Sequence, residues 1–280
     1  MKTLLAVIGD GQAVSLLETA LLAARRFDSR IIGLNAVTAE YAVVFGGEMG
    51  LTISSEVDRS VEQESDLKRS EARRLFHDIM ARHDIPVGAL PDHGPSAEWR
   101  EEAGRQNLVV GTLGRAFDLI LLERPARLNS LAEATLEDAL FESGRPVLMT
   151  PPNPPPSLGE RILVAWNGSS ETARALAFAM PFLKQAKAIE VVSVEGGTLP
   201  GPLAEIVAQN LALHGLAVTA RHIPAKGRAA GAIYLDAAKE WGADLMIKGA
   251  YTQSRLRQLI FGGATRYILS EAPIAVLLAH

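Results

Sequence analysis

The sequence predicts an α/β protein made of two tandem domains, each an open parallel sheet flanked by helices. Three observations support this prediction. Short apolar runs that are typical of buried parallel strands alternate with longer segments that are typical of helices. The alternation occurs twice along the chain. A proline-rich stretch near the middle separates the two occurrences.

That stretch is residues 151–156, Pro-Pro-Asn-Pro-Pro-Pro. Proline at this density excludes a helix or a central strand and favours an extended, semi-rigid connector. We therefore expect one domain over residues 1–150 and a second over residues 160–280.

The first half predicts strands and helices in alternation. The expected strands are residues 4–8, 31–37, 118–122 and 147–149, and the expected helices are about 13–26, 54–84 and 131–141. The helix over 54–84 is long, and its apolar residues recur every three or four positions. The strand at 147–149 follows Arg145-Pro146, as a matching strand follows Ala272-Pro273 in the second half.

The second half repeats the order of the first. Its expected strands are residues 162–166, 189–194, 244–248 and 274–278, and its expected helices are about 170–185, 202–214 and 265–270. A shift of 157 positions superposes Asp10 on Asn167 and Val37 on Val194, and a shift of 126 superposes Asp118 on Asp244. The smaller shift reflects the longer middle segment of the first half.

Composition excludes several functional classes. The chain has 280 residues, 48% of them hydrophobic, with a net charge of −4 and no cysteine. The absence of cysteine excludes disulfides and thiolate metal sites, and the weak charge indicates no nucleic-acid partner. No apolar run is long enough for a membrane helix, and no leader is visible, so we expect no membrane partner and a cytoplasmic location.

The most informative motif follows the expected strand 244–248. Gly249-Ala250-Tyr251-Thr252 is followed by nine residues and then by Gly262-Gly263-Ala264-Thr265, where a helix begins. A helix N-terminus offers free N–H groups that suit a phosphate, and glycine permits close approach of the backbone to a ligand. Lys248, Arg255 and Arg257 would add positive potential. Alternatively, the glycines only form the turn and the arginines face solvent.

This loop makes the second half resemble a universal stress protein domain, and the whole chain resembles the tandem form of that family. The resemblance implies a Rossmann-like, adenine-nucleotide α-hydrolase-like fold and a site for ATP, with Mg²⁺ if the nucleotide is bound. The family loop is Gly-x-x-Gly, nine residues, then Gly-Ser or Gly-Thr. Here Gly249 and Gly262 keep their positions, whereas Thr252 replaces the second glycine and Gly263 replaces the Ser or Thr.

The resemblance also implies the other site residues. Asn167 stands where the family has an Asp beside the adenine and ribose, and Val194 would contribute a backbone contact to the adenine. The implied nucleotide-binding set is Asn167, Val194, Gly249, Thr252, Gly262, Gly263, Ala264 and Thr265. The family pairs domains through terminal strands, so strands 147–149 and 274–278 are expected to pair within the chain, and a homodimer of the chain is a further expectation.

The first half departs further from the nucleotide-binding pattern. Glu123 stands where the second half has Gly249, and Glu133 lies near the start of the following helix, where it would repel a phosphate. Arg124 and Arg127 are the cations expected to offset this charge in part. A structural role for this half is therefore favoured over ATP binding.

Other sites are not supported by the residues. Gly9-Asp10-Gly11 lacks the third glycine of a dinucleotide fingerprint, since Val14 stands there. His77 and His83 are six residues apart, which places them on different helix faces and does not favour a metal site. No motif of a catalytic nucleophile is present.

Three functions remain open. The first is a stress-response binding or regulatory protein that holds ATP or another adenine nucleotide in its second domain. The second is a non-nucleotide scaffold, or a protein that binds a small apolar ligand. The third is slow ATP hydrolysis, for which the sequence names no catalytic residue.

Overall fold

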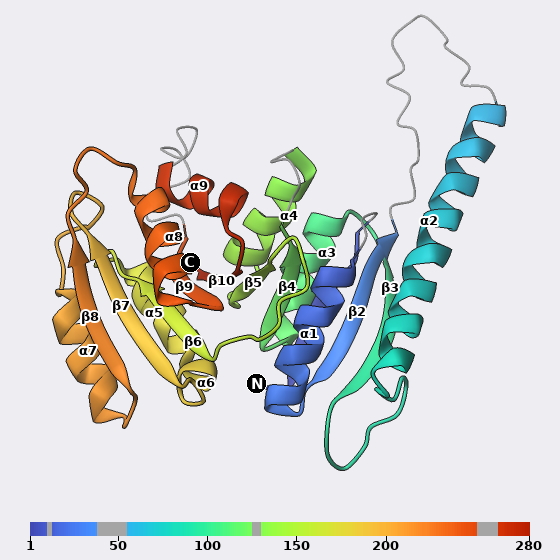
Figure 1. Ribbon diagram of the computed structural model, residues 1–280. Coiled ribbons are helices and arrows are strands. Elements are labelled where there is room, and N and C mark those ends of the chain that lie inside the picture. Colours follow the sequence, from blue (N-terminus) through green and yellow to red (C-terminus); the bar gives the residue numbers. More distant parts are fainter. Residues whose placement is uncertain (10–12, 38–54, 125–129, 251–262) are drawn as a thin grey trace, which may run out of the picture.

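The computed structural model describes residues 1–9, 13–37, 55–124, 130–250 and 263–280, and of residues 55–64 and 130 only the backbone. Within these residues the strands form one ten-stranded sheet in the order β3-β2-β1-β4-β5-β10-β9-β6-β7-β8. Helices cover both faces of the sheet (Figure 1). The expected α/β class with mostly parallel strands is confirmed.

The first half of the chain contributes one half of the sheet. Its strands are β1 (Thr3–Val7), β2 (Arg30–Val37), β3 (Ser96–Ala103), β4 (Leu119–Glu123) and β5 (Val147–Thr150). Its helices are α1 (Val14–Phe27), α2 (Ser55–Arg82), α3 (Gln106–Leu113), the 3-10 turn Gly114–Ala116 and α4 (Ser130–Phe141). All neighbouring strands of this half pair in parallel.

The second half contributes the other five strands. They are β6 (Arg161–Ala165), β7 (Ala188–Val194), β8 (Val218–Ile223), β9 (Leu245–Gly249) and β10 (Ala275–Ala279). Its helices are α5 (Ser170–Phe178), α6 (Met180–Leu183), α7 (Ala204–Leu213), α8 (Ala230–Trp241) and α9 (Gly263–Glu271). These strands also pair in parallel.

Several elements differ from those that the sequence predicts. The expected single helix over 170–185 is two helices, with Ala179 between them and Pro181 in the first turn of α6, because proline has no N–H to continue the first helix. Strands β3 and β8 and helices α3 and α8 have no counterpart among the expected ranges. The charged residues of β3 hide its apolar alternation, which is typical of a strand at the edge of a sheet.

The two halves join through an antiparallel pair of strands. Leu148 of β5 lies opposite Leu277 of β10, and these two strands stand in the centre of the sheet (Figure 1). They are the two terminal strands from which internal pairing is expected. The chain thus buries both terminal edges against each other, which leaves β3 and β8 as the edge strands.

The repeat extends to the residues that hold the strands together. Asp118 Oδ2 accepts hydrogen bonds from the backbone N–H groups of Lys2 (2.5 Å) and Thr3 (3.1 Å). The matching Asp244 accepts from the N–H groups of Glu160 and Arg161, both at 3.0 Å. Each acid therefore ties the start of the fourth strand of its half to the start of the first.

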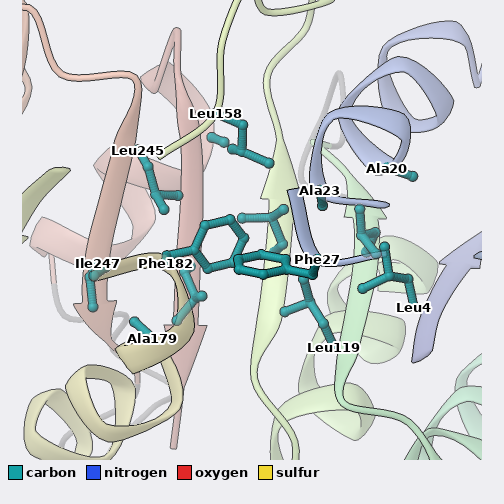
Figure 2. Close-up of a cluster of buried hydrophobic side chains, with 14 of the residues drawn as sticks. Leu4, Ala20, Ala23, Phe27, Leu119, Leu158, Ala179, Phe182, Leu245 and Ile247 are labelled. Carbon is teal, nitrogen blue, oxygen red and sulfur yellow. The ribbon is translucent and has the colours of Figure 1, made fainter. Parts of the chain in front are cut away.

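The core continues across the junction between the halves. Phe27 of α1 and Phe182 of α6 meet edge to face with ring centroids 4.8 Å apart, among apolar residues of both halves (Figure 2). Beside them the Arg26 guanidinium donates to the carbonyl oxygens of Leu158 (3.1 Å) and Gly159 (2.9 Å), which follow the proline-rich connector. The connector is thereby fixed to α1.

Across the described parts of the chain, every helix is either too short or too polar to cross a bilayer.

Candidate functional site

The candidate site lies where the strand order of the second half reverses. Strand β6 stands between β9 and β7, and its helix α5 packs on one face of the sheet whereas α9, which follows β9, packs on the other. In open α/β sheets, ligands bind beyond the carboxyl ends of strands at such a point. The strands that flank this point are β6 and β9. Asn167 follows the end of β6, and Gly249 is the last residue of β9.

Asn167 is part of the cap of α5. Its side-chain Oδ1 accepts hydrogen bonds from the N–H of Ser169 (3.2 Å) and from the hydroxyl of Thr172 (2.5 Å), and Ser169 caps the helix through the N–H of Thr172 (3.2 Å). The carboxamide oxygen is therefore occupied in this structure. No hydrogen bond of the Asn167 Nδ2 group is seen among the described residues.

Gly249 is needed by the packing of α5. A Cβ atom at this position would lie 2.4 Å from the backbone nitrogen of Thr172 and 2.7 Å from the carbonyl carbon of Glu171. The first turn of α5 thus rests on the end of β9, and only glycine admits it. The approach of a helix is therefore a structural reason for this glycine, and the approach of a ligand stays a prediction of the loop motif.

Val194 is fully buried, and its carbonyl oxygen accepts a hydrogen bond from the N–H of Gly197 (3.0 Å). The Val194 backbone, from which a contact to adenine is expected, therefore closes a turn with Gly197 in this structure. The same loop continues across the end of β6, where Leu199 N–H donates to the Asn167 carbonyl at 2.8 Å. Val194 and Asn167, which are 27 positions apart, are in this way brought together.

Tyr234 of α8 also reaches this edge, and no sequence motif points to it. Its hydroxyl donates to the carbonyl oxygen of Trp166 at 3.1 Å, at the end of β6. Burial raises the pKa of this hydroxyl above its ordinary value, and a hydrogen bond with the Val194 backbone opposes the rise. Tyr234 therefore joins the ends of β6 and β7 as a neutral hydroxyl.

The start of α9 completes the described part of the site. Gly263 is exposed, and Ala264 and Thr265 are half-buried. A Cβ at Gly231 would lie 2.8 Å from the Ala264 carbonyl oxygen, so this glycine lets α8 approach the first turn of α9. Exposed N–H groups at the first residues of a helix are available to an anion.

Lys248 connects this turn with β9. Its Nζ donates to the Thr265 hydroxyl and to the Gly249 carbonyl oxygen, both at 2.7 Å. The residue is only 6% exposed, and burial lowers the pKa of its amine to about 8. A buried amine thus stands between the end of β9 and the first turn of α9.

Part of the predicted loop lies outside the described residues. Thr252 and Gly262 of the predicted site, together with Arg255 and Arg257, fall in residues 251–262. The other predicted residues form a connected series. Asn167 contacts Thr172, which rests on Gly249, and Lys248 links Gly249 to Thr265.

The corresponding edge of the first half has different chemistry. Glu123 ends β4 as Gly249 ends β9, and burial raises the pKa of its carboxyl. Leu122, which is buried, stands where Lys248 does. Arg124 does not offset these acids as the sequence predicts, because its guanidinium donates to the carbonyls of Ser270 (2.6 Å) and Ala272 (3.3 Å) at the end of α9. Arg127 lies outside the described residues.

Within the described residues, no three His, Cys, Asp or Glu side chains are grouped as they are in a metal site. His83, which directly follows α2, instead hydrogen-bonds to Glu18 through Nε2 at 3.0 Å and to Arg25 through Nδ1 at 3.2 Å.

Comparison with known proteins finds a family likeness in the second half of the chain. Residues 193–280 match the sequence model of the Universal stress protein family. The matched segment contains β9, Lys248 and α9 but begins after Asn167. No curated protein matches the chain.

Solved structures extend the likeness in fold to the whole chain. A universal stress protein from Archaeoglobus fulgidus has a TM-score of 0.70 and 17% identity, with 99% of this chain and 95% of that chain covered. A Pseudomonas aeruginosa protein described as a universal stress protein has a TM-score of 0.53 and 18% identity, with 100% and 93% covered. By sequence, residues 193–280 resemble the universal stress proteins, and by fold the whole chain resembles these two solved structures.

Proposed function

We propose that this protein is a stress-response regulatory protein whose second half binds an adenine nucleotide, ATP, beyond the carboxyl ends of β9, β6 and β7. The observation that carries the proposal is the position of the first turn of α9. It starts with an exposed Gly263 at the point where the strand order reverses, and the buried Lys248 amine lies beside it. A helix N-terminus and an amine both favour phosphate oxygens.

Each described residue has a role in this proposal. The N–H groups of Gly263, Ala264 and Thr265 receive the phosphates, and Mg²⁺ enters with them. Asn167 offers its Nδ2 to the ribose side. Val194 and Tyr234 shape the adenine side, where the Val194 carbonyl becomes available only if the turn to Gly197 opens.

The first half is proposed to support the second without holding a nucleotide. Glu123 at the end of β4 would face the phosphates with a carboxyl group, and Leu122 replaces the lysine amine. Arg124 of this half instead holds the carbonyl end of α9. Stability and positioning of α9 are therefore the contribution of the first half.

The test is a charge change at the first residue of α9. Among the described residues a Cβ added at Gly263 meets no atom within 4 Å, and a carboxylate is favourable at a helix N-terminus, so we expect Gly263→Asp to fold. The same carboxylate repels phosphate. We expect calorimetric titration of ATP with Mg²⁺ to show at least about tenfold weaker binding for Gly263→Asp than for the natural protein, whereas Gly263→Ala keeps its affinity.

Two results would contradict the proposal. One is the absence of ATP from the natively purified protein together with no heat at millimolar ATP. The other is equal affinity in Gly263→Asp and the natural protein. A different small molecule released from the native protein would favour a scaffold or an apolar ligand. Phosphate release above that of Gly263→Asp would add slow hydrolysis to the binding function.

A further inference from the structure

Lys248 is a charged residue in an apolar position. It lies on β9 one residue from Ile247 and two from Met246, both fully buried, and is itself 6% exposed. The equivalent position on β4 is Leu122, which is 7% exposed. The strand therefore accepts an apolar side chain here, and the amine in the second half requires an explanation, because burial of an ammonium group is costly without a partner.

The amine has neutral partners only. It donates to a hydroxyl and a carbonyl oxygen, and within the described residues no carboxylate lies within ion-pair distance of it. Residues 251–262, which lie beside it in the chain, contain no Asp or Glu. The charged groups on the described strands and helices around β9 are Arg161, Glu171, Arg174, Asp236, Lys239, Glu240, Arg266, Glu271 and His280. None of them contributes to the lowered pKa of Lys248, whose cause is burial.

The position of the amine adds a second electrostatic cost. Thr265, which accepts its hydrogen bond, is the third residue of α9 and belongs to the first turn. The N-terminus of a helix is the positive end of its dipole, where a cation is unfavourable and an anion favourable. Two positive groups therefore meet at this point, and one anion would relieve both.

We propose that the Lys248 amine is a direct ligand of an anion with phosphate-type oxygens, bound between that amine and the N–H groups at the start of α9. This inference deepens the proposed function, on which it rests for the identity of the ligand, but it concerns the anion alone. The amine takes over the positive and donor role at a site whose loop lacks the Ser or Thr hydroxyl at Gly263.

The proposal has a protonic signature. In the free protein the pKa of Lys248 is about 8, so part of the population carries a neutral amine at pH 8.5. A bound anion favours the charged form and raises this pKa. Binding at pH 8.5 therefore takes up protons, up to roughly 0.7 per site, and the affinity falls as the pH rises above 8.

The experiment uses inorganic tripolyphosphate and ATP as separate probes. Each is titrated calorimetrically into the natural protein at pH 8.5 in two buffers of different ionisation enthalpy, which yields proton uptake. Lys248→Met removes the charge and keeps the length of the side chain. Lys239→Met removes the same charge from an exposed position on α8 and is the matched control.

We expect tripolyphosphate to bind the natural protein and Lys239→Met with proton uptake. Lys248→Met should bind at least about tenfold more weakly and take up no protons. A thermal melt of Lys248→Met at or above that of the natural protein will show that the loss is not unfolding. Equal affinity and equal proton uptake in Lys248→Met, or no tripolyphosphate binding by the natural protein, would overturn the inference.

The two probes separate this inference from the proposed function. If tripolyphosphate binds through Lys248 and ATP binds no better than tripolyphosphate, the anion site stands and the adenine nucleotide is wrong. If ATP binds equally well to the natural protein and Lys248→Met, the nucleotide stands and the role of Lys248 is wrong.

Discussion

A glycine in a binding motif can make room for a ligand or for another part of the protein, and Gly249 makes room for a helix. The loop pattern indicates a ligand that comes close to the backbone, whereas the structure places the first turn of α5 against this residue. A side chain here would displace a helix and not only a nucleotide. Loss of binding in a variant at Gly249 would therefore say little about phosphate recognition. A variant at Gly263 is informative, because a Cβ added there meets no atom of the described residues within 4 Å.

We predict that Gly249→Ala lowers the free energy of unfolding by about 1–3 kcal/mol even without ligand, because the added Cβ overlaps the backbone of Thr172. Urea denaturation monitored by circular dichroism measures this loss. Gly263→Ala, in which the added Cβ meets nothing, is the control and should stay within about 0.5 kcal/mol of the natural protein. Unchanged stability in Gly249→Ala would show that α5 shifts easily.

Asp118 and Asp244, the acids directly before β4 and β9, have equivalent roles. Each accepts backbone N–H groups that begin the first strand of its half. Burial tends to raise the pKa of Asp118, but hydrogen bonds from the N–H groups of Lys2 and Thr3 outweigh it, so the pKa lies below its ordinary value. The charged carboxylate is thus the stabilising form.

We predict that Asp118→Ala costs about 1–3 kcal/mol of folding free energy, because two strand N–H groups lose their acceptor. Asp244→Ala should cost a similar amount. Because the pKa of Asp118 is lowered, its contribution is complete above the pKa of the unfolded chain and disappears as the pH falls through the folded pKa. Denaturation of the natural protein and of Asp118→Ala from pH 7 to pH 3 should therefore show their free energies of unfolding converging at the acid end. A constant difference would be evidence against the assignment.

At the scale of elements, α9 is held at both ends by residues from different parts of the chain. The Thr265 hydroxyl in its first turn accepts a hydrogen bond from the Lys248 amine. At its other end, backbone carbonyl groups accept hydrogen bonds from the guanidinium of Arg124, which belongs to the first half. A cation at the carbonyl end of a helix is favourable, whereas one at the opposite end is not. The helix therefore has one cation at its favourable carbonyl end and another at its unfavourable N-terminal end.

We predict that Arg124→Met increases amide hydrogen exchange in residues 263–271, since the last turn of α9 loses a charged donor worth about 1.5–3 kcal/mol. Mass-spectrometric exchange resolves this segment. Arg115→Met removes an arginine that caps the Glu142 carbonyl within the first half and should leave α9 unaffected. If α9 exchanged equally in both variants, the contact between halves would have no stabilising effect.

For the whole molecule, the continuous sheet and shared core predict that the two halves unfold together. The β5–β10 pair places both halves in one sheet, and the Phe27–Phe182 contact joins their cores (Figure 2). Neither half has a separate apolar layer on this face. Binding at α9 would therefore be expected to stabilise the first half as well.

We predict that calorimetry of the full chain shows one transition, and that Phe182→Ala lowers the free energy of unfolding by about 3–5 kcal/mol while the transition stays single. Phe178→Ala, at a half-buried position in the same half, should have a smaller effect. Two transitions, of which only one responds to Phe182→Ala, would mean that the halves fold independently.

Much of this molecule follows from local pattern. The apolar runs and the repeat predict the α/β class and place β1, β2, β4, β6, β7 and β9 within one or two residues. The repeat also identifies Asp118 with Asp244, whose contacts prove equivalent. Strand β3 escapes such reasoning, because an edge strand does not need an apolar sequence.

The candidate site is only partly legible in the sequence. The glycine spacing predicts the end of β9 at Gly249 and the start of α9 at Gly263, because turns and helix starts depend on neighbouring residues. It does not reveal that α5 packs against Gly249, that the Tyr234 hydroxyl hydrogen-bonds to the Trp166 carbonyl at the end of β6, or that Lys248 is buried. These facts depend on residues far away in the chain.

By itself, the sequence determines the kinds of elements, their order, the repeat and the chemistry available at each strand end, because these follow from hydrophobic periodicity and from backbone preferences of nearby residues. Only the tertiary structure decides which groups remain free. Arg124 reaches Ser270, 146 positions away, and is lost to the first half. Among the described residues Lys248 lies against Thr265 without a counter-ion, and this arrangement results from long-range packing that no local pattern encodes.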